Sequence, residues 1–421
     1  MRIKSAVWRQ QLYGIALSSL ALSLTGAAQA ENSIGAALTG GKVNLDMRYR
    51  YEHVSDDDTA VPATKDANAS TVRTRLGYTT GSFYSWNAML EAENVTAVGD
   101  EHYNNTIPGG DVSYSKVADP ATTEINQAVL GFTGLEGSVA TLGRQRIILD
   151  NARWIGNVGW RQNEQTYDSF ELVNKALPDT TLTYAYIDNV NRITGNDDPN
   201  GDHRMTSHLL NGSYAGLGFG TLTGYAYLLD YDKSTLAGKS TQTLGARFAG
   251  SSAMNDSTTL LYTAEYARQS DYGDNPASYD LNYFLGEIGA TLSGVTVKYG
   301  YEKLGGNVGD GAAVQTPLAT LHAHNGWADL FAGGTPVTAT DAGLVDQYLS
   351  VGGALMAINL AGVYHDFAAD DGSADYGTEW DFMASRTWEK MYTLGFKYAT
   401  YSADSFSVDT DKMWLWGEVK F

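Results

Sequence analysis

The 421-residue chain contains no cysteine and only 8 prolines. The absence of cysteine excludes both disulfide bonds and thiolate chemistry. Beyond residue 30, no apolar run approaches the ~20 residues that a membrane-spanning helix needs. The chain must therefore gain its stability from one large hydrogen-bonded structure, without covalent cross-links and without apolar membrane helices.

Positive charge is scarce as well. Lys and Arg number 28 against 48 Asp and Glu, which gives a formal net charge of −20. Such an acidic chain repels phosphate backbones, so we expect no nucleic-acid partner. The acids gather in segments that we interpret as loops, such as 56–58 and 370–371. Solvated loops explain these runs most simply, and cation bridging to lipopolysaccharide is the alternative.

The first 30 residues have the layout of a cleaved secretory signal. A basic start is followed by an apolar stretch over 12–24 and by the small-residue end Ala28-Gln29-Ala30. This order of regions is typical of export signals. We predict cleavage after Ala30. The remaining sequence has no linker or low-complexity tract, so we predict a single domain over 31–421.

What the chain has in abundance is glycine, with 46 residues, and aromatic residues, including 27 tyrosines and 9 tryptophans. Their pattern has a period of two. From Val43 to Tyr51 the odd positions are apolar or aromatic, whereas the even positions from Asn44 to Glu52 are polar or charged. This alternation predicts strands with one apolar face and one polar face.

The spacing of such segments indicates how the strands are arranged. We count eighteen, near 42–54, 69–80, 83–95, 124–134, 138–148, 165–174, 180–190, 205–214, 219–232, 240–249, 257–268, 279–292, 295–304, 344–355, 358–367, 376–386, 391–401 and 411–421. Connections after even-numbered segments are short, and most of those after odd-numbered segments are long. Short periplasmic turns and long outer loops are typical of outer-membrane barrels. We therefore predict an all-β fold, a transmembrane antiparallel β-barrel of about 18 strands in the outer membrane of a Gram-negative bacterium.

The final segment supports this location. Met413, Leu415, Val419 and Phe421 share one face of an alternating strand that ends in an aromatic residue. Such an ending resembles the signal by which outer-membrane barrels are recognised for insertion, and we assign that role to Phe421. The partners expected are therefore the barrel-assembly machinery, outer-membrane lipid and lipopolysaccharide.

The polar faces of the first three strands supply the predicted lumen wall, which comprises Arg48, Arg50, Arg73, Arg75, Glu91 and Glu93. One interpretation is a ladder of salt bridges that satisfies the interior. The other is a transverse field that selects ions, as charged rings do in channels. The two interpretations overlap.

A second arginine cluster lies on the fifth strand and the loop after it: Arg144, Arg146, Arg153 and Arg161. An arginine facing mid-bilayer lipid costs roughly 2–4 kcal/mol, so we expect Arg144 and Arg146 both to point inward. We expect the loop 147–165 to fold into the barrel, where guanidinium groups bind carboxylate or phosphate and repel cations. The alternative is a structural plug held by Arg–Asp and Arg–Glu pairs. The segment 305–343 is predicted to be a long outer loop.

Two stretches carry a family resemblance. The run from Gly143 to Asp168, with ARWIGNVGWRQNEQTYD, and the run from Thr316 to Phe331 resemble the alginate-export family of outer-membrane barrels and the porins grouped with it. The resemblance covers most of the chain and implies a monomer. It also implies constriction roles for Arg144, Arg146, Arg153 and Arg161. The alginate exporters of that family are longer and have an arginine-lined constriction for a polyanion.

Enzyme motifs are missing from the sequence. We find neither G-x-S-x-G nor H-E-x-x-H. His322 and His324 form only a lone H-x-H pair, for which loop packing is the better explanation, so no metal site and no cofactor are predicted. We predict a porin, a passive channel for small hydrophilic solutes, anions included. An exporter of an anionic polysaccharide such as alginate is the alternative, and an outer-membrane enzyme or an adhesin is less favoured.

Overall fold

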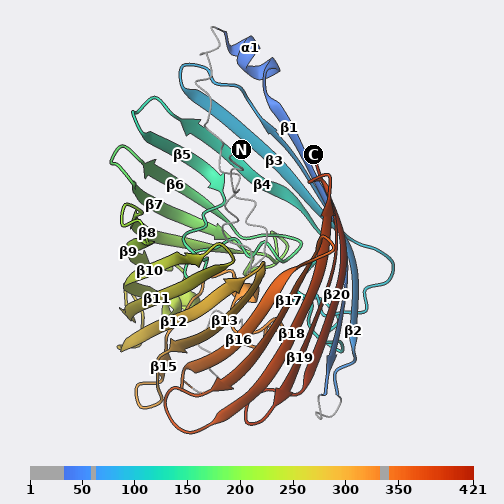
Figure 1. The fold of residues 1–421 in the computed structure, drawn as a ribbon. Coiled ribbons are helices and arrows are strands. Elements are labelled where there is room, and N and C mark those ends of the chain that lie inside the picture. Colours follow the sequence, from blue (N-terminus) through green and yellow to red (C-terminus); the bar gives the residue numbers. More distant parts are fainter. Residues whose placement is uncertain (1–32, 58–62, 332–340) are drawn as a thin grey trace.

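The computed structural model describes residues 33–57, 63–331 and 341–421. The predicted signal over 1–30 lies outside the described residues. Within them, eighteen strands form one closed antiparallel sheet in which sequence neighbours pair and β20 pairs back with β1 (Figure 1). Closure leaves no sheet edge exposed. The number of strands and their antiparallel order confirm the predicted barrel.

The elements are as follows. The barrel strands are β1 (Lys42–Asp56), β2 (Ala67–Thr79), β3 (Trp86–Ala97), β4 (Thr122–Phe132), β5 (Ser138–Gln145), β6 (Thr166–Asn174), β7 (Thr180–Asn191), β8 (Asp202–Tyr214), β9 (Gly220–Leu229), β10 (Thr241–Asn255), β11 (Thr258–Asp271), β12 (Asp280–Leu292), β13 (Val295–Leu304), β16 (Leu344–Leu355), β17 (Ile358–Ala368), β18 (Asp375–Trp388), β19 (Tyr392–Ala403) and β20 (Thr410–Lys420). Outside the barrel sheet are α1 (Ile34–Thr39), the 3-10 helices η1 (Ser234–Lys239) and η2 (Leu321–Ala323), and a short ribbon of β14 (Gly306–Asn307) and β15 (Ala312–Ala313).

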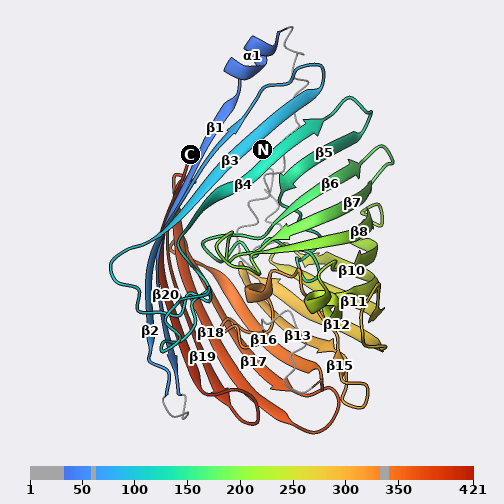
Figure 2. The ribbon, with the colours of Figure 1, turned by 180° about the vertical axis from the view of Figure 1, so that it is seen from behind.

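Each of the eighteen predicted segments overlaps one observed strand. The largest difference at a strand end is in β10, which was predicted to end at 249 and extends to Asn255. The short connections all lie at the end of the barrel that carries α1 and the C-terminus (Figures 1 and 2). Among the residues described, no helix is long and apolar enough to cross a bilayer.

The two faces of the wall differ as the alternation predicts. Leu142, Leu244 and Ile288 lie on the outer face, with 57%, 45% and 59% of their surface exposed. Inward positions are buried because loops fill much of the interior. A large cluster of buried apolar residues joins side chains of several strands to Trp154, Ile155 and Trp160 of the loop that follows β5. The core of this barrel therefore lies inside the lumen, between wall and loops.

Candidate functional site

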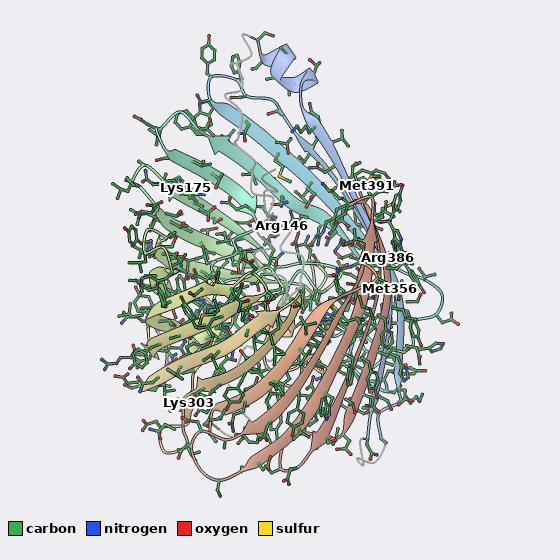
Figure 3. All side chains as sticks on the ribbon, viewed as in Figure 1. Arg146, Lys175, Lys303, Met356, Arg386 and Met391 are labelled. Carbon is green, nitrogen blue, oxygen red and sulfur yellow. The ribbon has the colours of Figure 1, made fainter. Side chains whose placement is uncertain are left out.

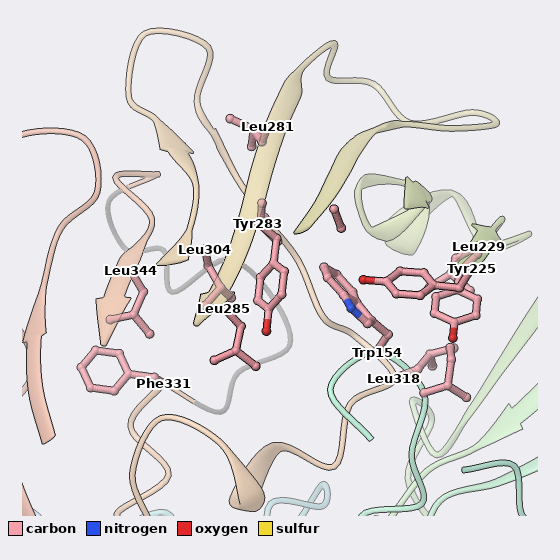
Figure 4. Close-up of a cluster of buried hydrophobic side chains, with 14 of the residues drawn as sticks. Trp154, Tyr225, Leu229, Leu281, Tyr283, Leu285, Leu304, Leu318, Phe331 and Leu344 are labelled. Carbon is pink, nitrogen blue, oxygen red and sulfur yellow. The ribbon is translucent and has the colours of Figure 1, made fainter. Parts of the chain in front are cut away.

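The loop over 146–165 runs through the barrel interior. Trp154 lies between Tyr283 and Tyr225, with ring centroids 5.0 and 6.2 Å away (Figure 4). Its indole nitrogen donates to Glu265 Oε1 at 2.9 Å. Ile155 pairs with Leu318 of the segment 305–343 as an isolated β-bridge. The loop is thus fixed both to the strands opposite its own and to a second loop.

The arginines of β1 hold this loop through its backbone. Arg48 donates from Nη2 to Trp160 O at 3.0 Å and from Nε to Gln162 Oε1 at 2.9 Å. Arg50 donates to Trp160 O and pairs with Asp119. Loop carbonyl groups have no secondary-structure partner here, and the guanidinium groups supply one. These two arginines are therefore anchors for the loop.

The arginines of β2 meet carboxylates on both sides. Arg73 Nη2 lies 2.5 Å from Asp46 and 3.3 Å from Glu418, and Arg75 pairs with Glu93 and with Glu164. The six residues predicted for the lumen wall are all buried on the inner face. Five of the six contact an oppositely charged side chain, whereas Arg48 contacts neutral groups of the loop.

Arg146 directly follows β5 and is labelled near the middle of the view in Figure 3. Its Nε donates to Glu164 Oε1 at 2.6 Å and its Nη2 to Glu91 Oε1 at 2.7 Å. The side chain retains 14% exposure. Among the four arginines of the second cluster, this one faces the lumen and has the most exposed side chain of the three inward members.

Arg153 and Arg161 are deeper in the loop and are buried. Arg153 Nε lies 2.9 Å from Glu302 Oε1, and Arg161 Nη1 lies 3.0 Å from Glu52 Oε2. Arg161 also contacts Asp329 at 3.0 Å. Burial lowers the pKa of Arg161, but the nearby carboxylates outweigh burial and raise it further above its ordinary value. Both guanidinium groups are already paired with carboxylates.

The prediction that Arg144 points inward is wrong. Arg144 lies on the outer face in phase with Leu142, whereas Gln145 and Thr141 are the buried inward residues of β5. Its Nε donates to Asp168 Oδ1 at 2.8 Å and its Nη2 to Asp168 Oδ2 at 3.2 Å. The cost used in the prediction applies to an unpaired arginine at the bilayer midplane and falls to about 0–1 kcal/mol near the interface. The bidentate pair with Asp168 offsets it further.

The segment 305–343, predicted to be an outer loop, also enters the barrel in its described part. Ala328 N donates to Glu379 Oε1 at 2.7 Å and Trp327 N to Asp381 Oδ2 at 3.3 Å. Asn325 donates to Glu302 Oε2 at 2.7 Å. An acidic wall formed by β13, β16 and β18 therefore holds this loop by its N–H groups, whereas the arginine wall holds the other loop by its carbonyl groups.

The two inward loops meet at His322. Its ring stacks on Trp160 with centroids 4.6 Å apart and planes 3° from parallel. Nδ1 lies 2.7 Å from Asp329 Oδ1, and Lys397 Nζ lies 3.0 Å from Nε2. Burial, opposed by Asp329, lowers the pKa of His322 to about 3, so the ring is neutral. Nδ1 then donates to Asp329 and Nε2 accepts from Lys397, which connects both loops to β19. We call Trp160, His322, Asp329 and Lys397 the latch.

Several of these residues were missed at the sequence level. Glu379, Asp381 and Lys397 lie at inward positions of predicted strands, so the period-two rule alone places them in the lumen. Asp119 comes from the loop over 98–121 and pairs with Arg50 while accepting from Gln162 N at 2.8 Å. No local sequence signal marks Asp119, because its position depends on the path of a long loop.

The chemistry that this interior supports is binding and steering of charge. Among the described residues, no group of three or more His, Asp or Glu side chains has the arrangement of a metal site. His322, half of the H-x-H pair, has both ring nitrogens engaged. The lumen has a basic wall on β1 and β2, an acidic wall opposite, and two interlocked loops between them.

Comparisons with known proteins agree with this architecture. A family model described as alginate export matches residues 41–302, more than half of the chain. A search of curated proteins gave no significant match.

Solved structures give the same fold. OccK9 (OpdG) of Pseudomonas aeruginosa has a TM-score of 0.71 at 13% identity, and the match covers 91% of this chain and 99% of that one. OccAB4 of Acinetobacter baumannii has a TM-score of 0.71 at 11% identity, covering 94% and 100%. OpdK of Pseudomonas aeruginosa, solved with vanillate, has a TM-score of 0.70 at 15% identity, covering 91% and 99%. These TM-scores establish the shared barrel fold.

Proposed function

Because this chain belongs to the alginate export family, we propose that it is a porin of the Gram-negative outer membrane, a passive channel for small hydrophilic solutes, anions included. The observation that carries the proposal is a closed eighteen-stranded barrel whose charged interior is narrowed by two inward loops. A barrel of this size encloses a lumen too wide for wall side chains alone to fill. The loops therefore set the aperture.

The way in which the lumen charges are paired favours small solutes over a long polyanion as the transported species. Arg75, Arg153 and Arg161 are each paired with a buried carboxylate, so their charge is largely spent inside the protein. Arg146 keeps an accessible part and is the constriction arginine that we assign to contact solute. Support for organic anions among the solutes comes from the structural neighbour OpdK, which was solved with vanillate, a small aromatic carboxylate.

Export of an anionic polysaccharide such as alginate is the second candidate, and the family description favours it. A polyanion needs a continuous run of unpaired cations along its path. The pairing of Arg73, Arg75 and Arg161 with carboxylates argues against such a run. The support for an enzymatic function is weaker still. His322 is buried and has no free ring nitrogen with which to act as a base.

Swelling of protein-containing liposomes distinguishes these functions. We expect fast swelling in small sugars and in small carboxylate salts, a rate that falls steeply with solute size, and no entry of alginate oligomers. Liposomes without protein and liposomes with heat-unfolded protein are the controls. Entry of alginate oligomers in preference to small solutes would favour the exporter. A folded barrel that admits no solute would overturn the proposal.

A further inference from the structure

Two cations near the outer end of the lumen lack the carboxylate partner that the constriction arginines have. Arg192 follows β7, and Lys239 ends η1; both side chains are half-buried. Arg192 donates from Nη1 to Gln165 Oε1 and, at 3.2 Å, to Pro317 O, which are neutral groups. Over the described ranges, no carboxylate oxygen lies within 4.0 Å of either cation.

Two neutral hydrogen-bonding groups accompany these cations. His203 on the inner face of β8 is 6% exposed, and its Nδ1 has no hydrogen-bond partner in the described structure. Tyr231 is 2% exposed, and its hydroxyl has no partner there either. The two rings lie edge to face, 5.8 Å apart. A buried polar atom without a partner is costly, so a bound group that supplies acceptors is favourable here.

The four side chains act on one another electrostatically. Burial lowers the pKa of Lys239, and the positive charge of Arg192 adds to this effect. The charges that act on His203 are Arg192, Lys239 and Lys233, with Asp198 as the weaker opposing group. Three cations therefore act on His203 in a chain whose net charge is −20.

The position suits the entry of a solute. Arg192 contacts Gln165 of the first inward loop and Pro317 of the second, so it lies where the two loops meet. It follows the end of β7 that is opposite the short turns, on the side of the long loops. A solute that enters from outside therefore meets this cluster before the constriction around Arg146.

We propose that Arg192, Lys239, His203 and Tyr231 form a capture site for the carboxylate or phosphate group of a small solute at the outer mouth of the channel. This inference rests on the proposed function. A guanidinium, an ammonium, an imidazole N–H and a phenol O–H are four donors suited to one oxyanion. The site would raise the local concentration of small anions above the constriction.

Isothermal titration of the full chain in detergent free of lipopolysaccharide, with sodium acetate and with inorganic phosphate, tests the site. We expect saturable binding that weakens by about tenfold or more in the Arg192→Gln/Lys239→Gln variant, because charge-assisted hydrogen bonds are lost. Arg192→Lys should retain most of the binding. The matched control is Lys175→Gln/Lys390→Gln, which removes two exposed cations at the opposite end and should bind as the wild type does.

Equal binding by the Arg192→Gln/Lys239→Gln variant and the wild type would overturn the site, as would absence of binding by the wild type. Displacement of phosphate by added lipopolysaccharide would instead assign the site to a lipid headgroup and overturn a small solute as its ligand. Heat-dependent mobility on gels verifies that each variant is folded. Binding without solute flux would support the capture site and overturn the channel function. Solute flux without binding would support the channel function and overturn the capture site.

Discussion

At the scale of single residues, the interior is governed by pairing of arginine with a carboxylate. Glu164 shows this most clearly. Its carboxylate accepts hydrogen bonds from Arg146 and, at 2.6 Å, from Asn126, and it lies 3.3 Å from Arg75 Nη1. Removing one partner of a buried pair leaves an uncompensated charge. Such residues determine whether the inward loop stays in place, and through it the width of the passage.

Glu164→Gln should destabilise the folded barrel by about 3–5 kcal/mol at pH 7, because two buried guanidinium groups lose their shared carboxylate. Burial raises the pKa of Glu164, but Arg146 and Arg75 outweigh it and hold the pKa well below its ordinary value. A group with a depressed pKa contributes stability that is present above about pH 4.3 and lost as the pH falls. The difference in folding stability between the variant and the wild type should therefore become smaller below about pH 4.

Thermal unfolding followed by gel mobility, from pH 7 down to pH 3, measures this difference. Glu136→Gln is the control, because Glu136 is exposed in a short turn. Equal unfolding temperatures for the Glu164→Gln variant and the wild type at pH 7 would show that the carboxylate does not hold the loop.

Arg144 and Arg146 form a matched pair two residues apart. Arg144 faces outward with Asp168, and Arg146 faces the lumen with Glu91 and Glu164. Arg146→Gln should reduce the preference for anions over cations in a salt gradient, whereas Arg144→Gln should leave it unchanged and alter stability by at most about 1 kcal/mol. The reversal potential in planar bilayers checks both. A shift caused by Arg144→Gln alone would contradict the outward assignment.

At the scale of elements, strands could be predicted and loop paths could not. Alternation is a local property, so β1 and β16 follow from their own residues. The inward path of residues 305–331 depends on Glu379 and Asp381, which lie far along the chain. The orientation of Arg144 was missed for a related reason, because its partner Asp168 lies on the next strand.

A substitution at Gly326 tests how the second inward loop packs against the acidic wall. Its φ is +84°, and an added Cβ would lie 2.4 Å from Glu379 Oε2. Gly99 has a φ of +83° with nothing within 4 Å of the same added atom, so it is a matched control. An alanine at either position costs about 1–2 kcal/mol in backbone strain. Only Gly326→Ala should also displace the loop from the acidic wall.

Limited proteolysis by chymotrypsin reports this displacement, because Trp327 and Phe331 are buried in the docked loop. Gly326→Ala should be cleaved in this segment at least several times faster than Gly99→Ala. Equal resistance of the two variants would mean that the contact with Glu379 does not position the loop.

At the scale of the whole molecule, closure joins the two ends of the chain. β20 pairs with β1, and Phe421 N donates to Leu45 O at 2.9 Å. Arg73 on β2 lies 3.3 Å from Glu418 on β20, so an ion pair spans this seam on the inner face. The even number of strands could be predicted by counting alternating segments, and the final aromatic residue is read directly from the sequence.

Phe421→Ala should reduce the amount of folded barrel in the outer membrane of cells, because we expect the terminal aromatic residue to be recognised during insertion. Refolding of the purified variant into detergent should change little, since the side chain is 61% exposed on the outer face. Tyr392→Ala, 41% exposed beside it, is the control. An equal defect in both assays would indicate a role in stability alone.

We expect the barrel to contain a passive aqueous path that is narrowed by the latched loops. Single-channel recording of the wild type and of Trp160→Ala in planar bilayers tests it most directly. The 4.6 Å stack of Trp160 on His322 joins the loops, so its loss should release them. The wild type should show a steady ohmic conductance, and the variant should show a larger, noisier one. A folded wild type that passes no current, or a variant of unchanged conductance, would contradict a path narrowed by these loops.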